Sequence, residues 1–188
     1  MKRAFLIHGW EGYPEESWRP WLKRELEKKD FQVVVPKMPD TNNPTYDKWL
    51  PYLTKIAKPV SENDYFVGHS LGCITILRFI ENLGQGEKVG GAVLVAGFGH
   101  DLEYERYKGE LSSFFRKPID WEKIKKHCSQ FVAIHSDDDP WVPIEHNALF
   151  KEKLNAQSII EHKMKHFSGD DGIRELPAAL NALLEISK

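Results

Sequence analysis

Short hydrophobic runs alternate with longer amphipathic stretches along the whole chain. Six such runs are rich in Val, Ile or Phe and end at Gly, Pro, Asp or Ser, a pattern typical of β-strands. They cover residues 4–7, 31–35, 65–67, 92–95, 131–134 and 158–161. Four of the runs are nearly all apolar rather than alternating. This indicates strands that are covered on both faces, as in a parallel sheet with helices above and below.

The stretches between these runs have apolar residues at helical spacing. Trp18, Leu22 and Leu26 form one such stripe, and the stretch after Ser70 is apolar around most of its circumference. Strands and helices that alternate in this way predict a three-layer α/β/α fold with a six-stranded parallel sheet. Pro51 and Pro177 fall within helical patterns, and we expect each of these helices to begin late, with the proline in its first turn.

The chain has 188 residues, which is the usual length of a single domain, here residues 1–188. The segment from about 98 to 121 is irregular: it has aromatic residues but no clear period. These aromatic residues are Phe98, Tyr104, Tyr107, Phe114 and Phe115. A segment of this length without periodic structure in a small domain is usually functional or a small subdomain.

Charge and composition exclude several classes of function. Lys and Arg number 26 against 28 Asp and Glu, so the net charge of −2 offers no basic surface for nucleic acid. Two cysteines are too few for a disulfide framework or a four-cysteine zinc site. No run approaches the ~20 apolar residues of a membrane span. We therefore expect a cytoplasmic protein with no metal, no cofactor, no nucleic acid partner and no membrane association.

The most specific motif is Gly68-His69-Ser70-Leu71-Gly72, which lies between a predicted strand and a predicted helix. The pattern G-x-S-x-G in this context is typical of a nucleophile elbow, a sharp turn that exposes a serine hydroxyl. The two glycines let the strand and the helix approach closely. Ser70 would be the nucleophile, and the Leu71 N–H at the start of the helix would stabilise an oxyanion. The alternative interpretation is a helix-capping serine with incidental glycines.

A serine nucleophile needs a base and an acid, which follow it in the order acid, then histidine, in this architecture. His166 lies in a loop between the last strand and the last helix, at the edge of the sheet where α/β proteins build their sites. The acid should follow the strand at 131–134, where Asp137, Asp138 and Asp139 stand in a row. We favour Asp139 because the following proline restricts it to an extended conformation, and we place Asp137 next.

The loop after the first strand supplies further candidates. The Trp10 amide is the second candidate oxyanion donor, and its indole would form a wall of the substrate pocket. We place six residues in that pocket: His8, Gly9, Trp10, His69, Phe98 and Trp141. Of these, His8 is expected mainly to shape its loop, and His69, at the variable position of the motif, is expected to point away from Ser70.

Together, these residues resemble a known family. His-Gly-Trp at 8–10, Gly-His-Ser-Leu-Gly at 68–72, Asp-Asp-Asp-Pro-Trp-Val-Pro at 137–143 and His-Phe at 166–167 are similar to the small YdeN-like serine hydrolases, a group that includes retinoblastoma-binding protein nine. The resemblance implies a minimal α/β-hydrolase fold, a triad of Ser70, Asp139 and His166, and esterase activity on small acyl substrates. One position departs from the family pattern: Lys165 stands where a glycine usually precedes the histidine.

The function expected from the sequence is therefore a serine hydrolase that cleaves small acyl esters through an acyl-enzyme intermediate. One alternative is a non-catalytic protein-interaction module on a hydrolase scaffold. A nucleotide-binding domain has only Gly97-Phe98-Gly99 in its favour, and Leu102 stands where a third glycine would be needed. The retinoblastoma-binding segment of the family has no counterpart here, because residues 71–75 lack its acidic residue.

Overall fold

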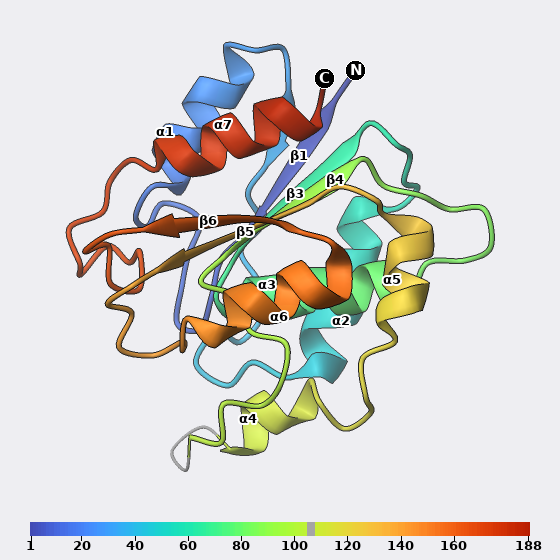
Figure 1. The fold of residues 1–188 in the computed structure, drawn as a ribbon. Helices are drawn as coiled ribbons and strands as arrows, with labels where there is room; N and C mark the ends of the chain where they lie inside the picture. The colour runs from blue at the N-terminus through green and yellow to red at the C-terminus, as the bar shows by residue number, and fades with distance from the viewer. Residues whose placement is uncertain (105–107) are drawn as a thin grey trace.

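The computed structural model describes residues 1–104 and 108–188, and its strands form one parallel sheet between two layers of helices (Figure 1). The strands are β1 (Arg3–Ile7), β2 (Gln32–Val34), β3 (Asp64–His69), β4 (Gly91–Val95), β5 (Phe131–Ser136) and β6 (Gln157–Glu161). Their order in the sheet is β2-β1-β3-β4-β5-β6, and every neighbouring pair is parallel. The predicted three-layer α/β fold with six parallel strands is confirmed.

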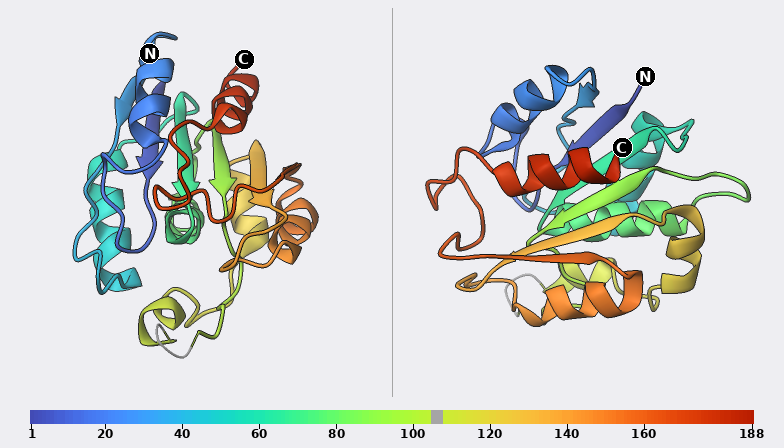
Figure 2. Two further views of the ribbon diagram at one scale, coloured as in Figure 1. Left: turned by 90° about the vertical axis from the view of Figure 1, so that its left-hand side faces the viewer. Right: turned by 45° about the horizontal axis from the view of Figure 1, so that its top comes forward.

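The helices divide between the two faces of the sheet, as Figure 1 shows. One face is covered by α1 (Arg19–Glu27) and α7 (Pro177–Ile186). The other is covered by α2 (Tyr46–Ala57), α3 (Leu71–Glu81), α5 (Trp121–His127) and α6 (Glu145–Leu154). The short helix α4 (Lys108–Ser113) lies on the side toward which the strands run and contacts the start of α2, where the Tyr46 N–H donates to the Ser113 hydroxyl (Figure 2).

The uniform hydrophobicity of the strands follows from this arrangement. Successive side chains of a strand point to opposite faces. In β1, Phe5 and Ile7 belong to the core beneath α2 and α3, whereas Ala4 and Leu6 belong to the core beneath α1 and α7. All four are almost completely buried. A strand with a core on each side is therefore apolar at most of its positions.

The two prolines in helical patterns occupy different positions in their helices. Pro177 is the first residue of α7, as expected. Pro51 lies inside α2, which begins five residues earlier at Tyr46, so the expected late start is wrong there. A proline inside a helix lacks the N–H of one backbone hydrogen bond. The burial of Trp49 and Leu53 on the same helix, both with no exposed surface, outweighs that loss.

The irregular segment is attached to the core by a residue of α3. Arg78 is buried, and its Nε donates to the carbonyl of Phe114 at 2.8 Å. Its other nitrogens donate to Lys117 O at 2.5 Å and to Pro118 O at 3.4 Å, and they pair with Glu81. The residues after α4 therefore have a fixed path across the molecule. Tyr107 lies outside the described residues.

None of the helices within the described ranges has both the length and the apolar character needed to cross a membrane.

Candidate active site

Ser70 lies at a sharp turn between β3 and α3. Its backbone has φ 52° and ψ −119°, a conformation that few non-glycine residues adopt and that is common at functional sites. The flanking glycines allow the turn to close. A Cβ on Gly72 would lie 2.3 Å from the carbonyl oxygen of Ile7, and one on Gly68 would lie 2.8 Å from the backbone of Cys73. Neither position has room for a side chain.

The loop after β1 lies directly against this turn. A Cβ on Gly9 would be 3.1 Å from the Cβ of Ser70, so this glycine allows the loop to approach. Trp10 and Leu71, the predicted oxyanion donors, line the same cavity as Ser70. Leu71 is the first residue of α3, where backbone N–H groups have no partner within the helix.

His166 meets Asp139 across the loops that follow β5 and β6. Its Nδ1 donates to both carboxylate oxygens, at 3.1 Å and 2.9 Å. The Asp139 side chain is 1% exposed and that of His166 is 15% exposed. Because a carboxylate only accepts, the proton of the neutral ring lies on Nδ1, and Nε2 is left as an acceptor.

The other two aspartates contact the same loop at neighbouring residues. Asp137 accepts from the backbone N–H of Lys163 and from His162, and its pKa is lowered first by that side-chain hydrogen bond. Asp138 accepts from the backbone N–H of Lys165 at 2.8 Å. Of the three candidates, Asp139 is the one whose carboxylate contacts the imidazole of His166.

The backbone of His166 is held from two further directions. Asp171 accepts from the N–H of His166 at 3.1 Å and from the hydroxyl of Ser168 at 2.6 Å. Burial raises the pKa of Asp171, but these hydrogen bonds outweigh it and the net shift is downward. On the other side, the Nε2 of His69 donates to the carbonyl of His166 at 2.7 Å. His69 also lines the cavity with Ser70, so the expectation that it points away is wrong.

His69 is nearly buried, and its ring centre lies 5.0 Å from that of His166. Burial lowers its pKa well below the usual value, and the nearby His166 and Arg19 lower it further. A neutral His69 adds no positive charge beside His166. Sequence reasoning identified neither this contact nor the one from Asp171, because both depend on the path of the 166–171 loop.

His8 does not line the cavity, so its placement among the pocket residues is corrected. It is fully buried, where its Nε2 accepts from the backbone N–H of Met38 at 3.1 Å and its Nδ1 donates to Gly9 O at 2.9 Å. Burial lowers its pKa to about 4. The ring shapes the loop after β1, the role that its position in the sequence suggested.

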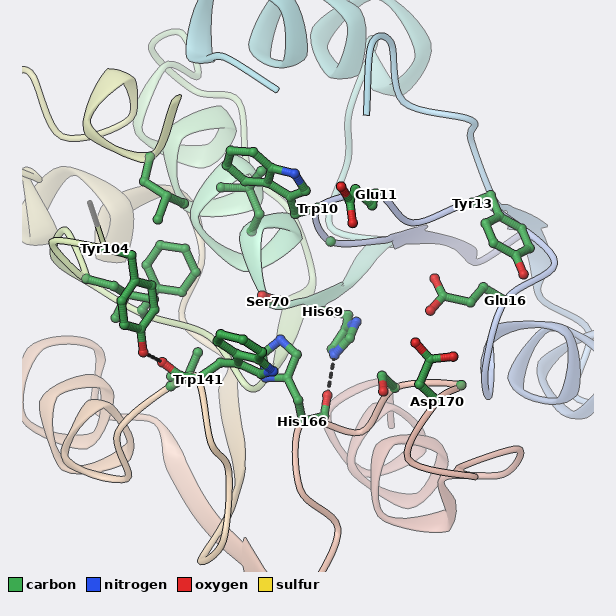
Figure 3. A pocket seen from close by; sticks show the side chains of 18 of the residues that line it. Trp10, Glu11, Tyr13, Glu16, His69, Ser70, Tyr104, Trp141, His166 and Asp170 are labelled. Carbon is green, nitrogen blue, oxygen red and sulfur yellow. Dashed lines mark hydrogen bonds between the residues drawn. The ribbon is translucent and has the colours of Figure 1, made fainter. Parts of the chain in front are cut away.

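Ser70 and His166 open into one cavity of about 490 Å³, shown in Figure 3. The other predicted pocket residues, Gly9, Trp10, His69, Phe98 and Trp141, all line it. In Figure 3, Trp10, Tyr104 and Trp141 lie on one side of the catalytic candidates, and Glu11, Tyr13, Glu16 and Asp170 lie on the other. The cavity thus has an apolar end and a polar end.

The described part of the chain has neither a hydrogen bond between Ser70 and His166 nor a cluster of metal-binding side chains. No hydrogen bond joins the Ser70 hydroxyl to His166 there, which is common when no substrate is bound. No group of three or more His, Cys, Asp or Glu side chains in the described ranges could hold a metal ion.

Comparison with known proteins identifies the family of this chain. The profile of the family described as "Serine hydrolase" matches residues 4–185. YdeN of Bacillus subtilis (strain 168) is 32% identical over 182 residues, which are 97% of this chain and 94% of YdeN. "Serine hydrolase RBBP9" of Rattus norvegicus is 28% identical over 178 residues, which are 94% of this chain and 87% of that protein.

Solved structures show the same fold. The crystal structure of the ydeN gene product from B. subtilis matches with a TM-score of 0.92 at 31% identity, covering 99% of this chain and 98% of that chain. Est1E from Butyrivibrio proteoclasticus matches with a TM-score of 0.74 at 15% identity, covering 98% and 88%, so it supports the α/β-hydrolase fold alone. From the family profile and the identity to YdeN, this chain belongs to the serine hydrolase family.

Proposed function

We propose that this protein hydrolyses esters of small apolar carboxylic acids, with Ser70 as nucleophile, His166 as general base and acid, and Asp139 as the residue that orients the imidazole. The observation that carries the proposal is one cavity lined by both Ser70 and His166, with Asp139 behind the ring. These three residues come from distant parts of the chain and follow three different strands.

The chemistry follows from the tautomer of His166. Asp139 accepts a hydrogen bond from Nδ1–H and so keeps the ring proton on that nitrogen. Nε2 can then accept the proton of Ser70 while the serine oxygen attacks the ester carbonyl. The tetrahedral intermediate then collapses, the bond to the alcohol oxygen breaks, and the imidazolium gives its proton to that oxygen. Water attacks the acyl-serine in the same way and releases the acid and the free Ser70.

The negative oxygen of each intermediate requires hydrogen-bond donors. We assign this role to the backbone N–H groups of Leu71 and Trp10, each worth about 3 kcal/mol in comparable sites. The apolar end of the cavity suits the acyl group. The polar end, on the other side of the catalytic candidates, suits the alcohol.

A fluorophosphonate probe, which reacts with activated serines, tests the proposal. We expect the wild type to be labelled and Ser70→Ala to be unlabelled, while Ser129→Ala, outside the cavity, keeps full labelling. Asp139→Asn should lower kcat on the order of 10⁴-fold, because it favours the imidazole tautomer with the proton on Nε2, which cannot accept the proton of Ser70. A folded wild type that neither reacts with the probe nor hydrolyses a panel of esters would refute the proposal and favour an interaction module.

A further inference from the structure

The apolar end of the cavity has a buried floor and an exposed rim. Phe98, Leu111 and Val142 are apolar residues of the cavity lining with at most 5% of their surface exposed. Trp141 lines the same cavity but is 52% exposed, and Tyr104 is partly exposed. An acyl chain that enters beside Ser70 would therefore meet buried side chains below and the rings of Tyr104 and Trp141 at the opening.

Tyr104 and Trp141 join two separate segments across this rim. Tyr104 follows β4 and Trp141 follows β5. The hydroxyl of Tyr104 donates to the carbonyl of Trp141, and the rings meet edge to face with centres 6.2 Å apart (Figure 3). Burial, together with the nearby Asp139 carboxylate, raises the pKa of Tyr104, so the hydroxyl keeps the proton that it donates.

The Trp141 end of this bridge is fixed by the catalytic acid candidate. Asp139 Oδ1 accepts from the backbone N–H of Trp141 at 2.8 Å and from that of Val142 at 3.1 Å. The Trp141 carbonyl is therefore a fixed acceptor. Tyr104, the donor at the other end, follows β4.

We propose that Tyr104 is a specificity-determining residue: its hydrogen bond to the Trp141 carbonyl closes the apolar end of the cavity and limits the length of the acyl group. This inference rests on the proposed ester hydrolysis and adds the class of acyl group. Short acyl groups fit beneath the bridge, whereas long ones require it to open.

The size of the effect follows from the value of one hydrogen bond. Tyr104→Phe keeps the ring and removes only the hydroxyl. A hydrogen bond between neutral groups contributes about 1 kcal/mol, which corresponds to about a fivefold increase in the open fraction. The kcat/KM of a substrate that binds only the open form rises in proportion to that fraction. A short substrate that fits the closed form gains nothing from this increase, so the ratio of kcat/KM for a long and a short substrate measures the effect.

The experiment measures kcat/KM for p-nitrophenyl acetate, butyrate, hexanoate, octanoate and decanoate. We expect Tyr104→Phe to raise the decanoate-to-acetate ratio about fivefold. Tyr104→Leu, which also shortens the side chain, should raise it at least as much. Tyr52→Phe, the same change on α2 outside the cavity, should leave the ratio unchanged, and thermal unfolding checks that all variants are folded.

The outcomes separate this inference from the proposed function. Wild-type hydrolysis of acetate with an unchanged or lower decanoate-to-acetate ratio in both Tyr104 variants would overturn the role of Tyr104 and leave the hydrolase intact. A wild type inactive on the whole series would overturn the proposed function, and the limit on acyl length would be refuted with it.

Discussion

Lys165, where the resemblance led us to expect a glycine, has a strained backbone. Its φ is 47°, a left-handed conformation that costs a non-glycine residue about 1–2 kcal/mol. Its backbone N–H donates to Asp138, so this conformation is part of the turn that leads to His166. The departure from the family pattern leaves the imidazole in contact with Asp139, and it is paid for in backbone strain.

We therefore predict that Lys165→Gly stabilises the protein. The relief of strain exceeds the extra entropy of glycine in the unfolded chain, for a net gain of about 0.5 kcal/mol. Urea unfolding measures it. Lys165→Ala is the matched control, because alanine removes the exposed side chain but keeps the strained Cβ, and it should bring no gain. A loss of stability in the glycine variant would contradict this account.

His69 is predicted to position His166 through its carbonyl group. His69→Ala removes the donor at 2.7 Å and should lower kcat on the order of 10- to 100-fold with little change in KM, because the imidazole is displaced. His69→Gln should recover most of kcat, since its amide nitrogen reaches the place of Nε2. Steady-state kinetics on one ester distinguishes the variants. Equal losses in both, or a change confined to KM, would speak against positioning.

For the three aspartates at 137–139, the sequence does not predict which carboxylate contacts which partner. The motif around Ser70 and the place of His166 in the last loop are local patterns, and they led to the right part of the sheet edge. Three adjacent carboxylates look alike in sequence. In the structure, Asp137 and Asp138 accept from the backbone N–H groups of Lys163 and Lys165, and Asp139 accepts from the imidazole of His166. Only the path of that loop assigns each carboxylate its partner.

At the scale of elements, hydrophobic runs predict strands well and tertiary contacts poorly. All six predicted strands exist, and β1 and β4, which are buried along nearly their whole length, are apolar at almost every position. The late start of α2 was wrong, because local rules for proline do not include the packing of Trp49 and Leu53. The run after Ser70 predicted a buried helix, but nothing in that run indicated a partner for its arginine.

That arginine, Arg78, should be the main attachment of the irregular segment. Arg78→Met leaves the carbonyls of Phe114 and Lys117 without donors in a buried place, and it leaves Glu81 without its ion pair. We expect a loss of about 3 kcal/mol in the free energy of unfolding, as is usual for a buried charged partner. Chemical denaturation measures it.

Arg116→Met is the matched control for this change. Arg116 forms an exposed ion pair with Asp47, and both side chains are more than half exposed. Such surface pairs contribute about 0–1 kcal/mol, so this variant should unfold near the wild-type midpoint. Equal stability losses in the two arginine variants would show that burial of Arg78 does not anchor the segment.

At the scale of the whole molecule, four buried histidines link stability to pH. They are His8, His69, His135 and His146, each at most 5% exposed. Burial is the largest cause in every case, and it lowers their pKa values, to about 4 for His8 and His146. The folded protein keeps these rings neutral at a pH where the unfolded chain, with pKa near 6.5, already binds protons.

The sign of the effect follows. Between pH 6.5 and about 4 the unfolded state binds more protons than the folded state. The free energy of unfolding is therefore not lowered by these rings above pH 6.5, and it falls as the pH decreases below that value. Each such histidine contributes about 1.4 kcal/mol per pH unit to that slope. His146→Gln, which replaces a ring outside the cavity lining by a side chain that does not titrate, should reduce the slope by about this amount.

Urea unfolding at several pH values between 4 and 7.5 checks this prediction, and His162→Gln is its control. His162 is exposed, and its hydrogen bond to Asp137 raises its pKa, so its charge favours the folded state at low pH. Removing it should leave the slope unchanged or make it steeper, the opposite of His146→Gln. If both variants flatten the slope alike, burial of the rings does not account for the acid sensitivity of the fold.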